Sequence, residues 1–475
     1  MARPTSTSLS TLLIFLFSCL GKAQHIGTLV PERHPSFPTQ LCTASEECTT
    51  RQTFLVADAL TRHFHAISDP SISCASFETI SNATLCPDAA TCAKNCALEG
   101  VEYGSKGVSA VGSAVTMRQY LFDGTTHRSV SPRLYLLAEG GEEYEMLRLL
   151  NQELAVDVDV SQLGCGMNGA VYLSEMEVTG NRDEERGNTA GAGYGVGYCD
   201  AQCFNTVSWI NGAPNFNQTS GACCNEMDIW EANSRANVFT PHTCASPDGC
   251  GINTYNLGHR EFYGPSAENV VDSSRPFTII TQFITDDDTS TGTLVEIKRV
   301  YVQDGKVMEN SKQTNNEKVG GIEGGYNGVI TEGYCAARNR SDFARLGGME
   351  AMGEALGRGM VLVFSLWNSE GDFMSWLDGD DGQNGPCGET EGDPARIVRE
   401  SPAVSVTFSN VRWGSVGSTF GQGGSSNGGS TGGGDDNGTG DGVFQAGVIK
   451  GGSTRLMVDG LWVGVVVLVV MIGLV

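Results

Sequence analysis

Basic residues are scarce in this chain of 475 residues. Lys and Arg number 30 against 55 Asp and Glu, which gives a formal net charge of −25. A field of this sign repels phosphate backbones, so we expect no nucleic-acid partner. It does not oppose a neutral ligand such as a polysaccharide, although the solubility of an extracellular protein would explain it equally well. No repeat of about 20–50 residues is visible, so nothing indicates a solenoid or a propeller.

Histidine pairs at zinc-finger spacing are missing as well. The Cys92-x-x-x-Cys96 and Cys42-x5-Cys48 segments would need such pairs to bind zinc. The chain has 16 cysteines, and Cys19 falls in the expected signal peptide, which leaves 15. In a secreted chain this number indicates a disulfide framework with one thiol left over rather than metal sites.

The N-terminus is typical of a secretory signal. Arg3 precedes an apolar run from Leu12 to Leu20, which is too short to span a bilayer. Small residues at Gly21 and Ala23 fit a cleavage site, so residues 1–23 are predicted to be a signal peptide. Sequons for N-glycosylation support the same secretory route; they begin at Asn82, Asn217, Asn339 and Asn437.

The C-terminus combines a flexible segment with an apolar tail. Residues 420–450 are interpreted as a linker, because 11 of the 22 residues from 421 to 442 are glycine. Residues 451–475 begin with small residues and end in an uncharged apolar run, which predicts a glycosylphosphatidylinositol attachment signal. A short transmembrane tail is the alternative. We therefore expect a secreted, extracellular protein attached to the cell surface, with a lipid anchor or tail as its membrane contact.

The region between the two ends is rich in strand-like runs and glycine turns. Asp304-Gly305 predicts a hairpin turn, and Met349 to Leu356, ended by Gly357, predicts a short helix. Residues 145–154 have helical propensity, but they lead directly into an alternating strand, so a strand is predicted there too. The other predicted strands are 133–137, 155–160, 277–283, 294–302, 360–366 and 404–411. Many strands and few helices predict an all-β fold built as a two-sheet sandwich.

Three acids stand within six residues at Glu226, Asp228 and Glu231. Glycoside hydrolysis with retention of configuration needs two carboxyl groups about 5–5.5 Å apart, one ionised and one protonated. In a regular strand Glu226 and Asp228 share a face, whereas Glu231 would point to the opposite side. A β-bulge near Ile229-Trp230 would restore the parity of Glu231, and we predict one there.

The order of the acids suggests a role for each. Glu226 would be the nucleophile and Asp228 its proton-sharing neighbour, while Glu231, with a pKa raised by burial and by nearby negative charge, would be the acid/base. A lone Glu-x-Asp-x-x-Glu pattern is more often a solvated strand face. The neighbouring Met227, Ile229 and Trp230 favour function, because a solvated face would not carry apolar residues so densely.

The segment Cys223-Cys-Asn-Glu-Met-Asp-Ile-Trp-Glu-Ala-Asn233 resembles the active-site strand of glycoside hydrolase family 7, the fungal-type cellulases. Further segments resemble the family in the same order along the chain. They are 85–96, 157–161, 165–172, 188–203, 240–244, 262–265, 359–367 and 408–414. The resemblance covers residues 24–419, which are therefore interpreted as the catalytic domain.

This resemblance implies a two-sheet antiparallel β-jelly-roll sandwich with a long concave substrate cleft. It implies the catalytic residues Glu226, Asp228 and Glu231, and it requires neither a metal ion nor a cofactor. His242 would be the site histidine, with a purely structural imidazole as the alternative. Trp367 and Trp376 would be platforms on which sugar rings stack. Polar groups that would line the cleft are Asn168, Tyr172, Tyr198, Asp200 and Gln202.

The resemblance also implies a disulfide pattern in which Cys244 has no partner. The implied pairs are Cys42–Cys48, Cys74–Cys96, Cys86–Cys92, Cys165–Cys387, Cys199–Cys224, Cys203–Cys223 and Cys250–Cys335. The exo-acting members of the family roof the cleft with long loops. Here only 19 residues separate Cys203 from Cys223 and five separate Cys244 from Cys250, as in endo-acting members. No cellulose-binding module follows the linker.

The sequence therefore predicts a monomeric, retaining endo-β-1,4-glucanase that hydrolyses internal bonds of cellulose or related β-glucans. A cell-surface transglycosidase that remodels wall β-glucan would use the same residues and stays open as the alternative. A non-catalytic glucan-binding protein is disfavoured because all three acids are present. An adhesion protein would explain the anchor but not the acidic motif.

Overall fold

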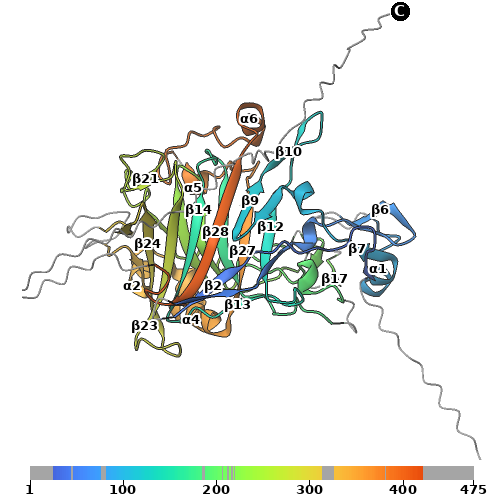
Figure 1. Ribbon diagram of the computed structural model, residues 1–475, viewed down its shortest axis with the longest axis horizontal. Coiled ribbons are helices and arrows are strands. Elements are labelled where there is room, and N and C mark those ends of the chain that lie inside the picture. Colours follow the sequence, from blue (N-terminus) through green and yellow to red (C-terminus); the bar gives the residue numbers. More distant parts are fainter. Residues whose placement is uncertain are drawn as a thin grey trace, which may run out of the picture. The chain divides into compact units, whose positions relative to one another are not determined.

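A computed structural model shows the arrangement of the chain (Figure 1). The residues it describes are 25–43, 47–75, 82–183, 188–205, 207–210, 213–215, 218, 220–312, 326–379 and 381–420. The predicted signal peptide, most of the predicted linker and the predicted anchor signal lie outside these residues. No helix within the described part of the chain combines the length and the apolar character needed to cross a bilayer.

Two large sheets form the body of the fold, one of eight strands and one of ten. The order in the eight-stranded sheet is β20-β19-β18-β15-β27-β12-β4, and β13 also pairs with β27. Its strands are β4 (Phe54–Ala57), β12 (Arg133–Leu137), β13 (Met146–Leu147), β15 (Asn168–Ser174), β18 (Glu226–Ala232), β19 (Asn237–His242), β20 (Ile252–Asn253) and β27 (Met360–Trp367).

The order in the ten-stranded sheet is β25-β24-β23-β14-β28-β2-β3, with β26 beside β24, β9 beside β28 and β8 beside β9. Its strands are β2 (Thr39–Cys42), β3 (Cys48–Arg51), β8 (Val108–Val111), β9 (Ala114–Arg118), β14 (Gln152–Asp159), β23 (Phe277–Thr285), β24 (Leu294–Gln303), β25 (Lys306–Glu309), β26 (Val329–Ile330) and β28 (Ser405–Ser415). The pairing is antiparallel throughout except between β2 and β28.

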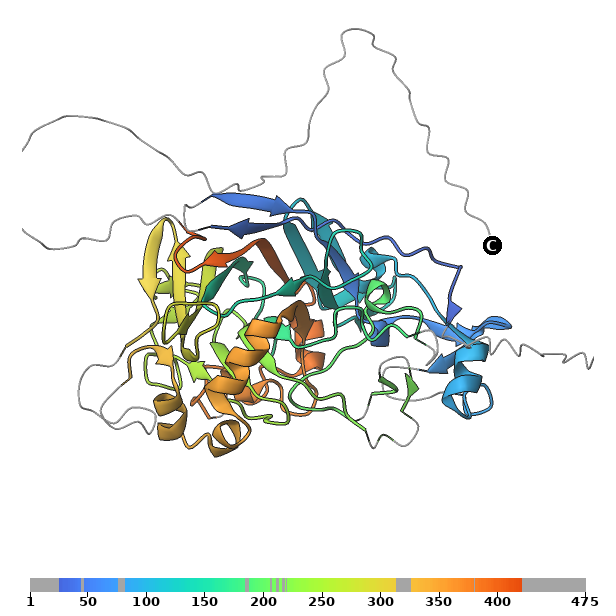
Figure 2. The ribbon, with the colours of Figure 1, turned by 90° about the horizontal axis from the view of Figure 1, so that it is seen from below.

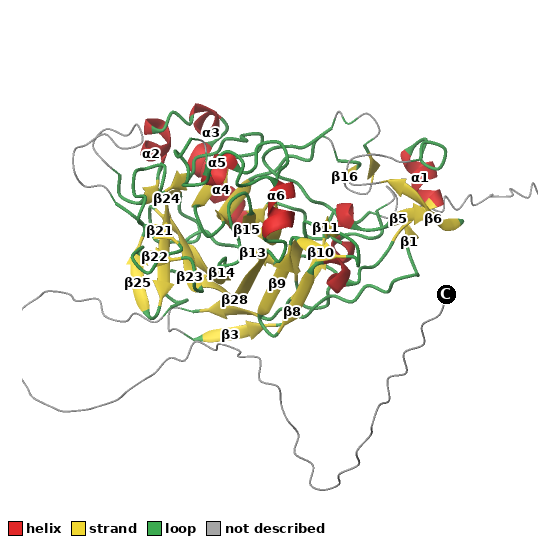
Figure 3. Ribbon diagram, turned by 90° about the horizontal axis from the view of Figure 1, so that it is seen from above, coloured by secondary structure: helices red, strands yellow, loops and turns green. Residues whose placement is uncertain are grey.

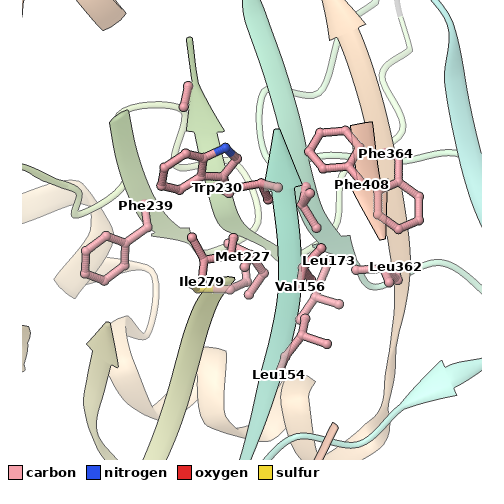
Figure 4. Packing of buried hydrophobic residues seen from close by; sticks show 14 of the residues in the cluster. Leu154, Val156, Leu173, Met227, Trp230, Phe239, Ile279, Leu362, Phe364 and Phe408 are labelled. Carbon is pink, nitrogen blue, oxygen red and sulfur yellow. The ribbon is translucent and has the colours of Figure 1, made fainter. Parts of the chain in front are cut away.

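The two sheets pack face to face through alternate apolar side chains. Figure 4 shows Leu154 and Val156 of β14 against Leu173 of β15, with Met227 and Trp230 of β18 alongside. All five belong to one continuous buried cluster. Because successive side chains of a strand point to opposite faces, this cluster fixes which residues of the eight-stranded sheet must face outward.

Short helices cover one side of the sandwich. Figure 3 shows α2 to α5 gathered opposite β28 and β3, and Figure 2 shows the same arrangement from the other side. The helices are α1 (Ala89–Asn95), α2 (Glu332–Ala337), α3 (Ser341–Arg345), α4 (Gly348–Arg358), α5 (Ser375–Asp378) and α6 (Pro394–Glu400). Single 3₁₀ turns occupy Ala59–Thr61, Tyr103–Lys106 and Ala192–Tyr194.

Smaller sheets complete the fold. One four-stranded sheet has the order β1-β7-β5-β6, and the remaining pairs are β10 with β11, β16 with β17, and β21 with β22. Their bounds are β1 (His25–Ile26), β5 (Phe64–Ala66), β6 (Asp69–Ala75), β7 (Cys96–Leu98), β10 (Tyr120–Phe122), β11 (His127–Ser129), β16 (Trp209–Ile210), β17 (Ala213–Pro214), β21 (Tyr263–Gly264) and β22 (Val271–Asp272).

The predicted all-β sandwich is confirmed, with two local differences. Residues 145–154 contain two strand pieces, β13 and the start of β14, separated by a turn in which Asn151 has a φ of 55°. The predicted helix at 349–356 continues through Gly357 to Arg358, because the left-handed terminating residue is Gly359, with a φ of 109°. The hairpin at Asp304-Gly305 is present, and both residues have the positive φ that such a turn requires.

All seven disulfides implied by the resemblance are present, and Cys244 is free. Two of them, Cys199–Cys224 and Cys203–Cys223, join the start of β18 to the loop at 199–203. These bridges fix that loop beside the strand that carries the three acids.

Candidate active site

A bulge in β18 places its three acids on one face. On the side of β15, Val171 pairs with Trp230 and Tyr172 pairs with Asp228, so Ile229 is the extra residue. The pairing of β18 with β19 shifts within the same stretch, between Asp228 and Glu231. Ile229 and Trp230 are neighbours in the strand, yet both belong to the core cluster. The alternation of inward and outward side chains therefore shifts by one residue between them. The predicted bulge is therefore present, and Glu231 lies on the same face as Asp228.

Asp228 and His242 form the centre of the site. His242 Nε2 lies 3.0 Å from Asp228 Oδ2, and both side chains are buried. His242 Nδ1 lies 2.9 Å from the carbonyl oxygen of Ser246. A carbonyl only accepts, so Nδ1 carries a proton, and Nε2 faces the Asp228 carboxyl. Burial and the charge of Asp200 raise the pKa of Asp228, which favours its protonated form and reduces the negative charge that it adds to the site.

Glu226 is held by the disulfide-bound loop. Its Oε2 accepts a hydrogen bond of 3.1 Å from the backbone N–H of Ala201, and its side chain is buried. Burial and the neighbouring Asp228 raise the pKa of Glu226, whereas His242 and the Ala201 N–H act in the opposite direction. These two groups are the ones that favour an ionised Glu226.

Glu231 is the acid that keeps contact with solvent. It is only partly buried, and its Oε1 accepts a hydrogen bond of 2.9 Å from Asn168 Nδ2 on β15. Burial and the charge of Asp228 raise the pKa of Glu231 to about 8. Near neutral pH Glu231 is therefore protonated, and because Oε1 accepts from Asn168, the transferable proton resides on Oε2.

Tyrosines and Asp200 occupy the neighbouring part of the same face. The Tyr172 hydroxyl, opposite Asp228 in the sheet, donates to the Tyr198 hydroxyl at 3.3 Å. Asp200 is buried, and its Oδ1 accepts from the N–H of Cys203 at 2.8 Å. Burial raises the pKa of Asp200, against the hydrogen bond from Cys203 and the charge of Arg133. Gln202 lies in the same loop and is partly exposed.

Two tryptophans stand together beyond Asn168. Trp367, at the end of β27, pairs with Asn168 in the sheet, and its ring stacks on Trp376 of α5 at 6.4 Å and 29°. Trp376 is 38% exposed, so the pair presents aromatic surface to solvent rather than to the core. Such faces bind the apolar faces of sugar rings.

Two residues near these groups were missed by the sequence reasoning. The Arg133 guanidinium lies 3.6 Å from the centre of the Tyr198 ring and forms an ion pair with Asp58. Asp378 accepts from Asn233 Nδ2 at 2.6 Å and from the Gly166 N–H at 2.8 Å, which connects α5 to the end of the catalytic strand. Neither residue's contacts have a signal in the local sequence, because each partner is more than 60 positions away.

A pair of glutamates on one sheet face, flanked by exposed tryptophans and amide and hydroxyl groups, defines a glycoside hydrolase of the β-sandwich class. Comparison with known proteins agrees. Residues 26–420 match the model of "Glycosyl hydrolase family 7". A probable endo-β-1,4-glucanase celB of Aspergillus terreus is 52% identical over 420 residues, which are 84% of this chain and 96% of that protein. Endoglucanase EG-1 of Hypocrea jecorina is 44% identical, covering 88% of this chain and 85% of its own.

Solved structures give the same result. A structure of endoglucanase I complexed with cellobiose is 40% identical, with a TM-score of 0.75 over 83% of this chain and all of that chain. A cellobiohydrolase of Daphnia pulex has the same TM-score at 32% identity, covering 83% of this chain and 99% of its own. The chain therefore belongs to glycosyl hydrolase family 7, and it is a retaining endo-β-1,4-glucanase.

Proposed function

We propose that Glu226 is the nucleophile, Glu231 the acid/base and Asp228 the group that regulates the charge of the nucleophile. The observation that carries this assignment is the bulge, which brings all three side chains to one face with distinct partners. Glu226 meets an N–H donor and stands near a histidine, both of which favour its ionised form. Burial raises the pKa of both glutamates, but Glu231 accepts its hydrogen bond from a neutral side-chain amide, whereas Glu226 accepts from a backbone N–H of the disulfide-bound loop.

The reaction then has two steps. In the first, Glu226 attacks the anomeric carbon while Glu231 gives its Oε2 proton to the departing glycosidic oxygen, and the C–O bond breaks. In the second, Glu231 removes a proton from a water molecule that attacks the same carbon, and Glu226 leaves as a carboxylate. Asp228, whose pKa is raised by burial and by Asp200, keeps its proton in both steps, so the carboxylate of Glu226 does not face a second full negative charge.

The substrate that we propose is cellulose or a related β-1,4-glucan. The endoglucanase I structure contains cellobiose, and the stacked Trp367 and Trp376 offer a matching surface for glucose rings. Asn168, Tyr198, Asp200 and Gln202 supply the hydrogen-bonding groups for sugar hydroxyls. We propose in addition that the protein acts as a monomer.

Trapping of the glycosyl-enzyme tests the assignment. A cellobioside with fluorine at C2 and a good leaving group should give a stable adduct whose mass maps to Glu226. Glu226→Gln should form no adduct and should lose the hydrolysis of carboxymethylcellulose, whereas Glu400→Gln, on the exposed face of α6, should behave as the parent enzyme. An adduct on another residue, or a product of inverted configuration, would refute the mechanism. Products longer than the substrate would indicate transglycosylation.

We also propose that the enzyme is secreted and attached to the cell surface through its C-terminal segment. Seven disulfides suit an oxidising compartment, and the sequon asparagines Asn82 and Asn339 are partly and fully exposed. The attachment signal itself lies outside the described residues. Expression of the full gene in a fungal host, followed by treatment of intact cells with a phosphatidylinositol-specific phospholipase C, should release the activity. Activity found only in the medium would contradict the anchor.

A further inference from the structure

An arginine crosses the sandwich core beneath the catalytic strand. Arg299 lies on β24 of the ten-stranded sheet, on the same inward face as Ile297 and Tyr301, and it is fully buried. Its Nη2 donates to the carbonyl oxygen of Ile229 on β18, in the other sheet. The side chain therefore connects the two sheets at the residue that forms the bulge.

The surroundings of this guanidinium are aromatic rather than acidic. Its carbon lies 4.5 Å from the ring centre of Phe239, 5.7 Å from that of Trp230 and 5.8 Å from that of Tyr301. Among the described residues, Arg299 Nε and Nη1 have no hydrogen-bond partner, and the neighbour that opposes the effect of burial on the pKa of Arg299 is Tyr301 rather than a carboxylate. Burial accordingly lowers the pKa of Arg299.

A charge in such a position is costly for folding. A buried cation without a carboxylate partner loses its hydration, and apolar residues of similar volume often replace buried charges without loss of stability. Cation–π contacts with three rings return part of this cost. Packing alone would therefore be served better by methionine or leucine at this position.

The contact with Ile229 explains what the arginine does. The extra residue of a bulge is left out of regular ladder pairing, so its backbone is easily displaced. Glu231 is two residues beyond Ile229, and its position relative to Glu226 depends on where the bulge sits. We propose that Arg299 is a positioning residue that fixes the bulge through the Ile229 carbonyl and thereby sets the acid/base Glu231 against the nucleophile Glu226. This inference rests on the roles proposed above for the two glutamates.

Loss of the donor should have a specific kinetic signature. A displaced Glu231 transfers its proton poorly, so bonds whose leaving group needs protonation suffer most. For 2,4-dinitrophenyl β-cellobioside, whose leaving group needs no proton, kcat/KM should change little. For phenyl β-cellobioside it should fall, because a displacement of about 1 Å can cost about 10²-fold. The ratio of the two kcat/KM values does not depend on the fraction of enzyme that is folded.

The test compares Arg299→Met, Arg299→Lys and the control Arg62→Met. Arg62 is also fully buried, but it pairs with Glu32 and does not contact β18. Arg299→Met should lower kcat/KM by about 10²-fold for phenyl β-cellobioside and by less than about 5-fold for the dinitrophenyl substrate. Arg299→Lys retains a donor and should restore much of the loss. Arg62→Met should lower Tm but leave the substrate ratio unchanged.

Azide gives a second readout. It attacks the glycosyl-enzyme without a general base, so it should accelerate turnover of the dinitrophenyl substrate by Arg299→Met and yield a β-glycosyl azide, with no such effect on the parent enzyme. An unchanged substrate ratio in a folded Arg299→Met, or failure of both Arg299 variants to fold, would show that Arg299 only stabilises the fold. Glu231→Gln tests the role of Glu231 independently of Arg299. If Glu231→Gln does not show the altered substrate ratio and the azide effect, Glu231 is not the acid/base, and the proposed function fails whatever Arg299→Met does.

Discussion

At the scale of single residues, the two glutamates of the site differ in their hydrogen-bond partners. Glu226 and Glu231 lie on one strand, yet one meets an N–H of the disulfide-bound loop and the other a neutral amide. Asp228 lies between them on the strand, beside His242, and its raised pKa favours a protonated carboxyl. The chemistry therefore depends on contacts from β15, β19 and the loop at 199–203 rather than on the acidic motif alone.

The raised pKa of Glu231 predicts the alkaline limb of the pH profile. Glu231 must be protonated for the first step, so kcat/KM for phenyl β-cellobioside should fall as pH rises through about 8. Glu231→Gln should lower the rate at pH 6 by about 10²–10⁴-fold and abolish this limb. Rates measured from pH 4 to 10 would check this. A limb that persists in Glu231→Gln would assign the titration to another group.

Substitution of the exposed Trp376 should weaken substrate binding without slowing the chemical step. Its ring stacks on Trp367 and is 38% exposed, so it can contact a sugar some distance from the cleaved bond. Trp376→Ala should raise KM for cellopentaose by about 10-fold, since an aromatic stack is worth about 0.5–1.5 kcal/mol beyond area burial. Trp376→Phe should be close to the parent. An equal loss on a short aryl glycoside would place the effect at the reaction centre instead.

At the scale of elements, β18 shows how a local irregularity makes the site. If β18 were a regular strand in which Ile229 took an ordinary ladder position, Glu231 would face the core in place of Trp230, and a buried unpaired carboxyl would replace an aromatic ring. The two bridges at Cys223 and Cys224 hold the loop that supplies the Ala201 N–H. Strand, bulge and bridges are therefore one functional unit.

Removal of one bridge should weaken the nucleophile specifically. In Cys199→Ala/Cys224→Ala the loop gains freedom, and the hydrogen bond from Ala201 to Glu226 is lost or lengthened. We expect kcat to fall by about 10-fold, in line with loss of one hydrogen bond to a charged group of about 1.5–3 kcal/mol. The matched control Cys42→Ala/Cys48→Ala, in β2 and β3, should lower Tm without this loss. Assays well below both Tm values separate activity from stability.

At the scale of the whole molecule, the fold and the placement of the three acids on one face of β18 could be predicted from the sequence. Alternating strands and glycine turns predicted the sandwich, and the parity of Glu231 predicted the bulge. Contacts between distant segments could not be predicted. In the local sequence, Arg299 is one polar residue within a predicted strand, and Asp378 is one acid two positions after a tryptophan. Their partners, Ile229 and Asn233, lie 70 and 145 positions away, and only the packing of the two sheets and of α5 brings them together.

The balance of buried and exposed acids predicts how stability depends on pH. Burial raises the pKa of Asp200, Glu226, Asp228 and Glu231, and it raises that of Asp378 to about 6. Groups with a raised pKa stabilise the fold most below their unfolded value near 4, and each contribution is lost as pH rises through the raised pKa, which is about 6 for Asp378 and about 8 for Asp228 and Glu231. The Arg62 partner Glu32 has a lowered pKa, so its contribution disappears only below about pH 4.5.

Stability should therefore be greatest near pH 5, with a Tm about 5 °C or more above that at pH 8. Calorimetry of the parent enzyme and of Glu231→Gln would check this, because the variant lacks one titrating group and should lose less stability between these pH values. A net charge of −25 also opposes compaction as pH rises. Salt at about 0.5 M screens that repulsion but leaves buried groups largely unaffected. A difference that vanishes in salt would assign the effect to surface charge, whereas one that persists belongs to the acids of the site.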